Sequence, residues 1–211
     1  MSAPHRIRLW GRISSINVRK AVWAAGELGL DVQRTDAGGE FGLVREPAFL
    51  ERNPNALVPL LEDGEVVLWE SNVIVRYLGA RYGRDGFYPE ALPERFDAER
   101  WMDWQQTTFN PASRHAFLQW IRTPADRRDA AAIAASVAAT EPLLHLLDRH
   151  LAGREFIGGD RFGIADIPLG CEVHRWFGLP QPRPALPHLE RWFRAVSSRP
   201  AARGLLDMPL S

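Results

Sequence analysis

Residues 53–82 hold the densest set of chemically useful side chains in this sequence. A short apolar run, a two-residue hairpin signal at Asp63-Gly64 and a second β-branched run lead directly to Glu70 and Ser71. Ser71 is expected as the N-cap of the helix that follows. This pattern brings a backbone edge, a carboxylate and a helix N-terminus close together, so a small peptide with a free amine and a free carboxylate could bind there.

A second polar group, at residues 12–17, lies between an expected first strand at residues 7–10 and an expected helix from about residue 17 to 28. Hydroxyl groups and a helix N-terminus stabilise a nearby anion. In the simpler interpretation, Ser14 and Ser15 only cap the helix. This segment contains neither tyrosine nor cysteine. Thiol–disulfide exchange, which needs a nucleophilic sulfur, is therefore disfavoured.

The composition of the 211 residues narrows the class of protein. The 26 basic and 26 acidic residues balance, which argues against a nucleic-acid or acidic-membrane partner. Cys171 is the only cysteine, so an internal disulfide and a cysteine-rich metal site are excluded, and a buried structural thiol is expected. Residues 1–12 are too basic for a signal peptide, and no run approaches the ~18 apolar residues of a membrane span. We therefore expect a soluble cytoplasmic protein without a metal.

Strand and helix signals alternate in the first part of the chain and only helix signals follow. The first part reads β-α-β-α-β-β-α, which predicts a thioredoxin-like sheet with parallel and antiparallel strands. We expect this domain at residues 1–83, a Gly- and Pro-rich linker at 84–93 and an all-helical domain at 94–211. The fold class is thus α/β plus all-α. The expected helices cover residues 94–122 with a kink near Asn110-Pro111, 128–151 with Pro142 inside, 164–177 and 186–197.

Val58-Pro59 followed by Glu70-Ser71 before a helix resembles the glutathione-binding half of the cytosolic glutathione transferases. The whole length is similar to that family, and most similar to its bacterial theta-like, serine-type members. Residues 158–166 resemble the family's helix-capping segment. Here Gly163 occupies the cap position where Ser or Thr is usual, so only the Asp166 half of the capping box is present.

The resemblance implies an enzyme that uses glutathione as co-substrate and activates its thiol. A free thiol has a pKa of ~8.5, and lowering it by one or two units stabilises the thiolate by roughly 1.4–2.8 kcal/mol. By resemblance, Ser15 donates the activating hydrogen bond to sulfur. Ser14 and Asn17 remain alternatives.

The resemblance also assigns binding roles. Val58 makes backbone contacts to the cysteinyl unit and Pro59 is in the cis form. Glu70 faces the γ-glutamyl ammonium while Ser71 holds the α-carboxylate. Arg45 is assigned to the glycyl carboxylate, although an exposed arginine at such a place often has no role.

An electrophile pocket between the two domains is a further implication, although aromatic residues at helical spacing more often form core. Its expected lining residues are Trp10, Ile13, Thr107, Asn110, His115 and Phe117. A homodimer is implied, with Gln105 or Thr107 reaching the partner's peptide, and a role in detoxification. A non-catalytic binding or scaffold protein and a glutathione-dependent peroxidase or dehalogenase remain alternatives. The physiological electrophile cannot be predicted from the residues.

Overall fold

The computed structural model describes residues 7–211, which form two compact units. The first unit ends at Asp85 and the second spans Gly86–Ser211. The expectation that no signal peptide is present rests partly on residues 1–6, which lie outside the described residues.

The first unit mixes strands and helices in the predicted order. Its elements are β1 (Ile7–Trp10), α1 (Ile16–Glu27), β2 (Val32–Thr35), η1 (Gly39–Phe41), α2 (Pro47–Leu50), β3 (Leu60–Asp63), β4 (Val66–Trp69) and α3 (Ser71–Tyr82). The strands form one sheet in the order β2-β1-β3-β4. β1 is parallel to β2, whereas β3 is antiparallel to both β1 and β4, so the sheet is mixed as predicted.

The hairpin between β3 and β4 is present, but its turn lies one position later than predicted. Asp63 pairs with Val66, so the two turn residues are Gly64 and Glu65. Gly64 has a φ of 63°, the left-handed conformation that tight two-residue hairpins require at this place. Asp63 therefore belongs to the strand rather than to the turn.

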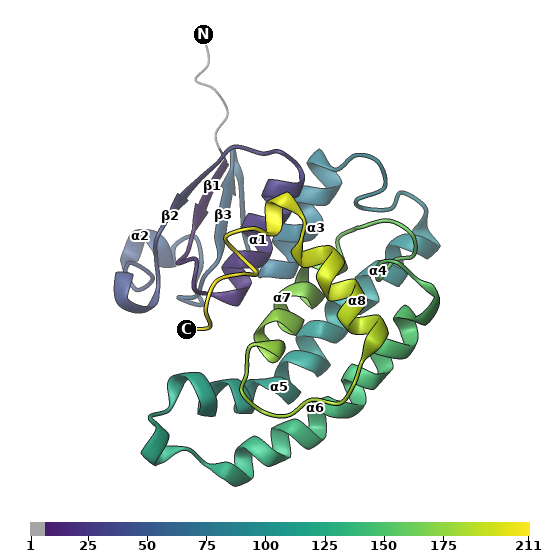
Figure 1. Ribbon diagram of the computed structural model, residues 1–211. Helices are drawn as coiled ribbons and strands as arrows, with labels where there is room; N and C mark the ends of the chain where they lie inside the picture. Colours follow the sequence, from purple (N-terminus) through teal and green to yellow (C-terminus); the bar gives the residue numbers. More distant parts are fainter. Residues whose placement is uncertain (1–6) are drawn as a thin grey trace. The chain divides into compact units, whose positions relative to one another are not determined.

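The two central strands, β1 and β3, place apolar side chains on both faces of the sheet, since successive side chains point to opposite sides. On one face, Trp10 and Leu60 pack with Phe49 of α2. Leu9 and Leu61 point to the other face and are almost fully buried. α1 and α3, which contact each other, lie on that second side (Figure 1).

The second unit consists of helices. They are α4 (Leu92–Trp104), η2 (Gln105–Phe109), α5 (Asn110–Phe117), η3 (Leu118–Arg122), η4 (Ala125–Arg127), α6 (Ala130–His150), η5 (Leu151–Gly153), α7 (Asp166–Phe177), α8 (Pro187–Ser197) and η6 (Pro200–Ala202). α5 packs against α6, and α7 and α8 pack against each other (Figure 1).

The helix predicted over residues 94–122 begins at Leu92 and contains two π-helical turns, η2 and η3. The predicted kink near Asn110-Pro111 coincides with the change from η2 to α5. Proline has no N–H to donate, and its ring clashes with a carbonyl of the preceding turn. A widened π turn directly before Pro111 relieves both constraints.

α6 carries the alanine-rich run and contains Pro142 as predicted. Among the described residues, one helical stretch, Ala130–Gly153, is long and apolar enough to cross a membrane by length and composition, with a mean hydropathy of 1.5. Serine, threonine, glutamate and histidine interrupt its apolar residues, so the stretch is not an unbroken apolar run of ~18 residues and the prediction that no such run is present is not contradicted. Alanine raises the mean hydropathy without supplying long apolar side chains. Within its unit, α6 packs against α5 and α8.

Asp166, the first residue of α7, is fully buried and accepts three hydrogen bonds. Its donors are the Gly163 N–H at 2.9 Å, the Ile157 N–H at 2.9 Å and the Trp192 Nε1–H at 2.7 Å. The predicted bond from the Gly163 N–H to the Asp166 carboxylate is thus present, but the N-cap residue of α7 is Ala165 rather than Gly163, and the helix begins at Asp166 rather than at residue 164. Burial raises the pKa of Asp166 to about 6, although the three donors act in the opposite direction.

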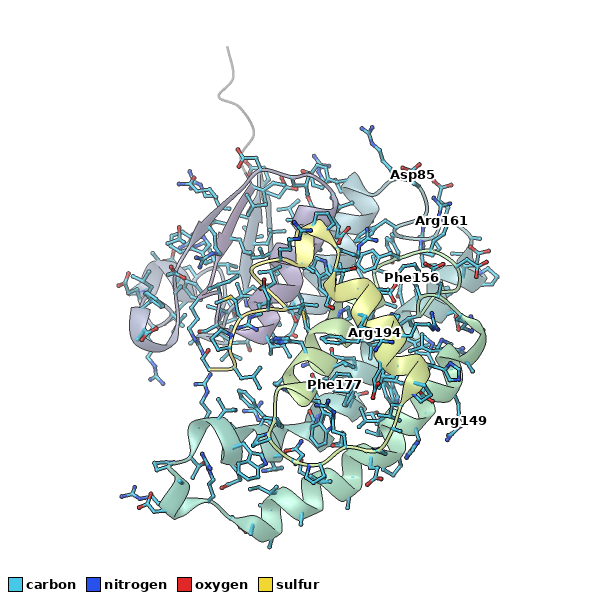
Figure 2. All side chains as sticks on the ribbon, in the orientation of Figure 1. Asp85, Arg149, Phe156, Arg161, Phe177 and Arg194 are labelled. Atoms are coloured by element: carbon cyan, nitrogen blue, oxygen red, sulfur yellow. The ribbon has the colours of Figure 1, made fainter. Side chains whose placement is uncertain are left out.

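α7 is joined to α8 by aromatic packing at its C-terminal end. Phe177, labelled in Figure 2, meets Phe193 edge-on with ring centroids 5.3 Å apart. The guanidinium of Arg183 lies 4.4 Å from the centre of the Phe177 ring. Cys171, in the middle of α7, is buried as predicted.

Candidate functional site

Four chain segments meet at one edge of the sheet in the first unit. Parallel pairing places the ends of β1 and β2 side by side, with Trp10 opposite Thr35. Antiparallel pairing adds the start of β3 and the end of β4, because Leu60 lies opposite both Trp10 and Trp69. The segments before α1, after β2, before β3 and before α3 are therefore neighbours. These segments contain Ser15, Val58 and Glu70.

The loop between β1 and α1 is held in one conformation by backbone and side-chain bonds. The Arg12 N–H donates to the Ala37 carbonyl at 3.0 Å, and the Ser15 N–H closes a turn on the Arg12 carbonyl at 3.1 Å. The buried Arg19 donates from Nε to the Ile13 carbonyl at 2.9 Å. Sequence reasoning missed Arg19, which acts here only because the first turn of α1 faces back onto the loop.

Ser15 is the N-cap residue of α1, but its side chain makes no capping hydrogen bond. The interpretation of Ser15 as a hydroxyl cap is therefore not supported. Ser14 is half-buried, and within residues 7–211 its hydroxyl has no hydrogen-bond partner either. Both hydroxyls are thus available to a ligand at the positive end of the α1 dipole.

Asn17 and Ser71 connect the two helix N-termini. The buried hydroxyl of Ser71 donates to Oδ1 of Asn17 at 3.3 Å. Because Asn17 lies in the first turn of α1 and Ser71 is the first residue of α3, the positive ends of both dipoles face the same region. This arrangement favours an anionic group at the sheet edge.

The peptide bond between Val58 and Pro59 is cis, which confirms the form implied by the resemblance. Val58 packs beside the cluster formed by Ala37, Phe49 and Leu60.

Asn53, which is buried, positions the chain just before this bond by donating from Nδ2 to the Leu57 carbonyl at 2.8 Å. Its Oδ1 accepts the Asn55 N–H at 3.1 Å. The Asn-Pro-Asn sequence could have indicated this turn, since Asn side chains often bond to the backbone two residues on.

Glu70, not Ser71, is the N-cap residue of α3, which corrects the prediction. Its carbonyl accepts the first helical bond, from the Ile74 N–H at 2.9 Å. Glu70 has a φ of 70°, so the chain turns sharply between β4 and α3 at this residue and Ser71 enters the helix. The Glu70 side chain is exposed at the edge, where its carboxylate can meet a cation.

The two pocket candidates of the first unit have different surroundings. Trp10 is surrounded by core partners: its ring meets Phe49 edge-on at 6.5 Å, Arg52 lies 4.9 Å above it, and its Nε1–H donates to Glu62 at 3.0 Å. This environment favours a core role for Trp10 over a pocket role. Ile13 is half-buried in the loop before α1.

Gln105 and Asn110 belong to a polar cluster inside the second unit. Glu172 is fully buried and accepts from Gln105 Nε2 at 2.8 Å, from Ser113 Oγ at 2.5 Å and from Arg175. Arg175 also donates to Asn110 Oδ1 at 2.7 Å. Gln105 is 1% exposed. The expectation that Gln105 reaches a partner's peptide was therefore wrong, because the buried Glu172 carboxylate needs its amide donor.

The other predicted pocket residues lie along the same helical stretch. Phe117 is half-buried between two arginines, with Arg175 5.0 Å and Arg122 5.7 Å from its ring centre. Thr107 is exposed and its hydroxyl donates to a carbonyl one turn earlier at 2.9 Å. His115 is exposed on α5. That these residues line one pocket stays a prediction.

Arg45 is exposed in the segment between η1 and α2. Within residues 7–211, no group of three or more His, Cys, Asp or Glu side chains is placed to hold a metal ion.

Comparison with known families gives matches in both units. The family model "Glutathione S-transferase, N-terminal domain" matches residues 5–80, and "Glutathione S-transferase, C-terminal domain" matches residues 107–200. The chain therefore belongs to the glutathione S-transferase family. The resemblance, the fold class and the assignment as a glutathione transferase are confirmed.

Individual relatives cover nearly the whole chain. This chain is 41% identical over 207 residues to glutathione S-transferase GstB of Escherichia coli K12. The alignment covers 97% of this chain and 100% of GstB. This chain is 30% identical to glutathione S-transferase 3 of Zea mays, covering 92% and 90% of the two chains. The theta class glutathione S-transferase of Xanthomonas axonopodis pv. citri, solved with glutathione bound, is 44% identical with a TM-score of 0.93, covering 98% and 100%.

Proposed function

We propose that glutathione binds across the edge of the sheet in the first unit and that its thiol is activated there for attack on a small electrophile. The observation that carries this proposal is the Ser71–Asn17 hydrogen bond, which joins the N-termini of α1 and α3 beside the two free serine hydroxyls. One region thus offers hydroxyl donors, two positive helix ends and the exposed carboxylate of Glu70.

Both charged groups on the α-carbon of the γ-glutamyl unit have a matching group in the proposed complex. The ammonium pairs with the Glu70 carboxylate, and the α-carboxylate accepts from N–H groups of the first turn of α3 and from the Ser71 hydroxyl, whose single proton turns from Asn17 Oδ1 to the ligand when glutathione binds. Those N–H groups have no partner within the helix, so an anion can bind them without displacing helical bonds. Val58 supplies backbone contacts to the cysteinyl unit.

Ser15 is the proposed activating residue. Its hydroxyl donates to the sulfur, and together with the α1 dipole it favours the thiolate over the thiol. The thiol proton passes to solvent and the sulfur lone pair forms the bond to the electrophilic carbon. In a substitution the leaving group departs with its electron pair, whereas in an addition the product carbanion takes a proton from solvent.

The thiol pKa of bound glutathione tests this proposal directly. Thiolate absorbance is followed against pH for the unaltered protein, for Ser15→Ala and for Ser14→Ala as the matched control. We expect a pKa at least one unit below the ~8.5 of a free thiol, raised in Ser15→Ala and unchanged in Ser14→Ala. A rise only in Ser14→Ala would transfer the role to Ser14. Binding with an unshifted pKa would favour a non-catalytic binding protein.

A homodimer is part of the proposal. β4 is an edge strand of the sheet, and its side chains Val67 and Trp69 are 41% and 40% exposed. A second copy packed against these side chains would remove apolar surface from water, which supports a dimer at this edge. Light scattering at micromolar concentration measures the assembly. A monomer at all concentrations would contradict the proposal.

The cellular setting is also proposed from the family resemblance. We place the enzyme in the cytoplasm and assign it to detoxification of small electrophiles by conjugation. Screening aryl halides, activated alkenes and organic hydroperoxides with glutathione separates conjugation from dehalogenation and from peroxide reduction, since all three use the same thiolate.

A further inference from the structure

Arg12 occupies an unusual position at the sheet edge. Its guanidinium lies against the backbone of Gly38 and Gly39. A Cβ on Gly38 would lie 3.1 Å from Nη1 of Arg12, and a Cβ on Gly39 would lie 3.2 Å from Nε and Cζ. A Cβ on Gly38 would also lie 3.4 Å from Cγ1 of Val58. The guanidinium therefore lies close to the residue proposed to bind the cysteinyl unit.

The two glycines create the space for this side chain. Gly38 has a φ of 77° and Gly39 a φ of 60°, conformations that favour glycine on backbone grounds alone. A side chain at either position would also press on the guanidinium, since the contact distances are shorter than ordinary van der Waals contact. The Gly38-Gly39 pair, which in the sequence indicates only a loop, therefore leaves room for the Arg12 guanidinium.

Arg12 lacks the charge partner that neighbouring arginines have. Arg34 pairs with Asp36, and Arg52 pairs with Glu62. Within residues 7–211, Arg12 makes no ion pair or side-chain hydrogen bond, although it is half-buried. A half-buried cation interacts more strongly with an incoming anion than an exposed one, because solvent screens it less.

The order of the strands decides which anionic group of a bound peptide lies near the Arg12 guanidinium. Glu70 and Ser71 follow β4, Val58 precedes β3, and Arg12 follows β1 beside the segment after β2. Adjacent strands lie ~4.8 Å apart, so the distance from the end of β4 to the region between β1 and β2 is about 12 Å. An extended tripeptide spans about 10 Å, and the γ-linkage lengthens it further.

On the basis of the proposed function, we propose that Arg12 binds the C-terminal glycyl carboxylate of glutathione and thereby selects peptides that carry a free carboxylate there. The planar guanidinium can donate two parallel hydrogen bonds to a carboxylate. Arg45, the residue that the resemblance assigns to this carboxylate, is exposed and screened by solvent. It is therefore a secondary contributor at most.

The test compares glutathione with its glycyl monoethyl ester, which lacks the terminal charge. Dissociation constants are measured by calorimetry for the unaltered protein, Arg12→Gln, Arg12→Lys and, as the matched control, Arg45→Gln. We expect the unaltered protein to prefer the free acid by about tenfold or more. Arg12→Gln should bind acid and ester equally, Arg12→Lys should keep part of the preference, and Arg45→Gln should keep nearly all of it.

The acid-to-ester ratio separates recognition from folding, since a structural role for Arg12 would weaken both ligands alike. Preserved preference in Arg12→Gln, or its loss in Arg45→Gln, would overturn the inference. Equal binding of acid and ester by the unaltered protein would also overturn it, while leaving the proposed activation of the thiol intact. If the unaltered protein bound neither ligand, the proposed function and this inference would both be wrong.

Discussion

The hydroxyl of Ser71 donates a hydrogen bond to Oδ1 of Asn17 across 3.3 Å, between residues 54 positions apart in the chain. This bond ties the first turn of α3 to the first turn of α1. The group proposed to bind the γ-glutamyl end is thereby connected to the helix that begins at the proposed activating serine. Ligand binding at one end and thiol activation at the other are therefore expected to depend on each other.

Removing Asn17 or Ser71 from this hydrogen bond should lower the free energy of unfolding, and the effects of the two changes should not be additive. We expect Asn17→Ala and Ser71→Ala each to lower the free energy of unfolding by about 1 kcal/mol, the net value of one partly buried hydrogen bond. The double variant should lose less than the sum, because the second change removes a partner already lost. Urea unfolding of the four proteins measures this. Strictly additive losses would show that the bond contributes no coupling.

Glu70→Gln should weaken glutathione binding about tenfold, because the amide keeps the shape of the side chain but loses the charge that faces the ammonium. Glu70 is exposed, so the free energy of unfolding should change by less than ~0.5 kcal/mol. Calorimetric titration provides the dissociation constant. Glu65→Gln, an exposed glutamate in the β3–β4 turn, is the matched control and should bind normally. Equal affinities for both variants would contradict the role of Glu70.

Asp166→Ala should destabilise the second unit by several kcal/mol. The change leaves three donors, the N–H groups of Gly163 and Ile157 and the Nε1–H of Trp192, without their acceptor in a buried place. Each unsatisfied buried donor costs about 1–3 kcal/mol. Thermal unfolding followed by Trp fluorescence measures the loss. Asp160→Ala, at an exposed position nearby, should leave the transition unchanged.

The pH dependence of stability should contain a contribution from Asp166. Its pKa is raised from 3.8 to about 6 in the folded chain, so between these values the folded chain binds more protons than the unfolded chain. The free energy of unfolding should therefore fall as pH rises from about 4 to about 6, by about 3 kcal/mol in total from this group.

Asp166→Asn removes the titrating group, so the difference between the two proteins isolates this contribution. Burial lowers the pKa of His150 below its ordinary value of 6.5, which acts in the opposite direction: stability is lost as pH falls below that ordinary value toward the lowered pKa. That effect is common to both proteins and cancels in the difference. Urea unfolding at several values between pH 4 and 7 gives the curves. A difference that does not vary with pH would rule out the raised pKa.

The parts of the fold that follow from local pattern were predictable. The succession of strands and helices in the first unit follows from apolar periodicity and from glycine and proline positions. Boundaries shifted by one or two residues where backbone geometry decided them. Gly64 lies at the first turn position because glycine tolerates positive φ. Glu70 is the N-cap residue of α3 because the chain turns there.

Roles that depend on long-range contacts were not predictable. Gln105 looked like a surface polar residue on a helix, yet it bonds to Glu172, 67 positions away. Trp10 was expected to line a pocket, and its contacts with Phe49 and Glu62, which favour a core role, arise only in the fold. Arg12 had no local signal that distinguished it from other arginines. Its partners in space, Gly38 and Gly39, become neighbours only when β1 and β2 pair.

The sequence by itself determined the family, the order of elements and the identity of the groups that could bind a small anionic peptide. These depend on residue types at short spacing, which the chain carries whether folded or not. Only the tertiary structure decided that the N-termini of α1 and α3 converge through Asn17 and Ser71 and that an unpaired Arg12 lies beside Val58. The physical reason is that sheet pairing sets distances between segments remote in sequence, and electrostatic and hydrogen-bond energies depend on those distances.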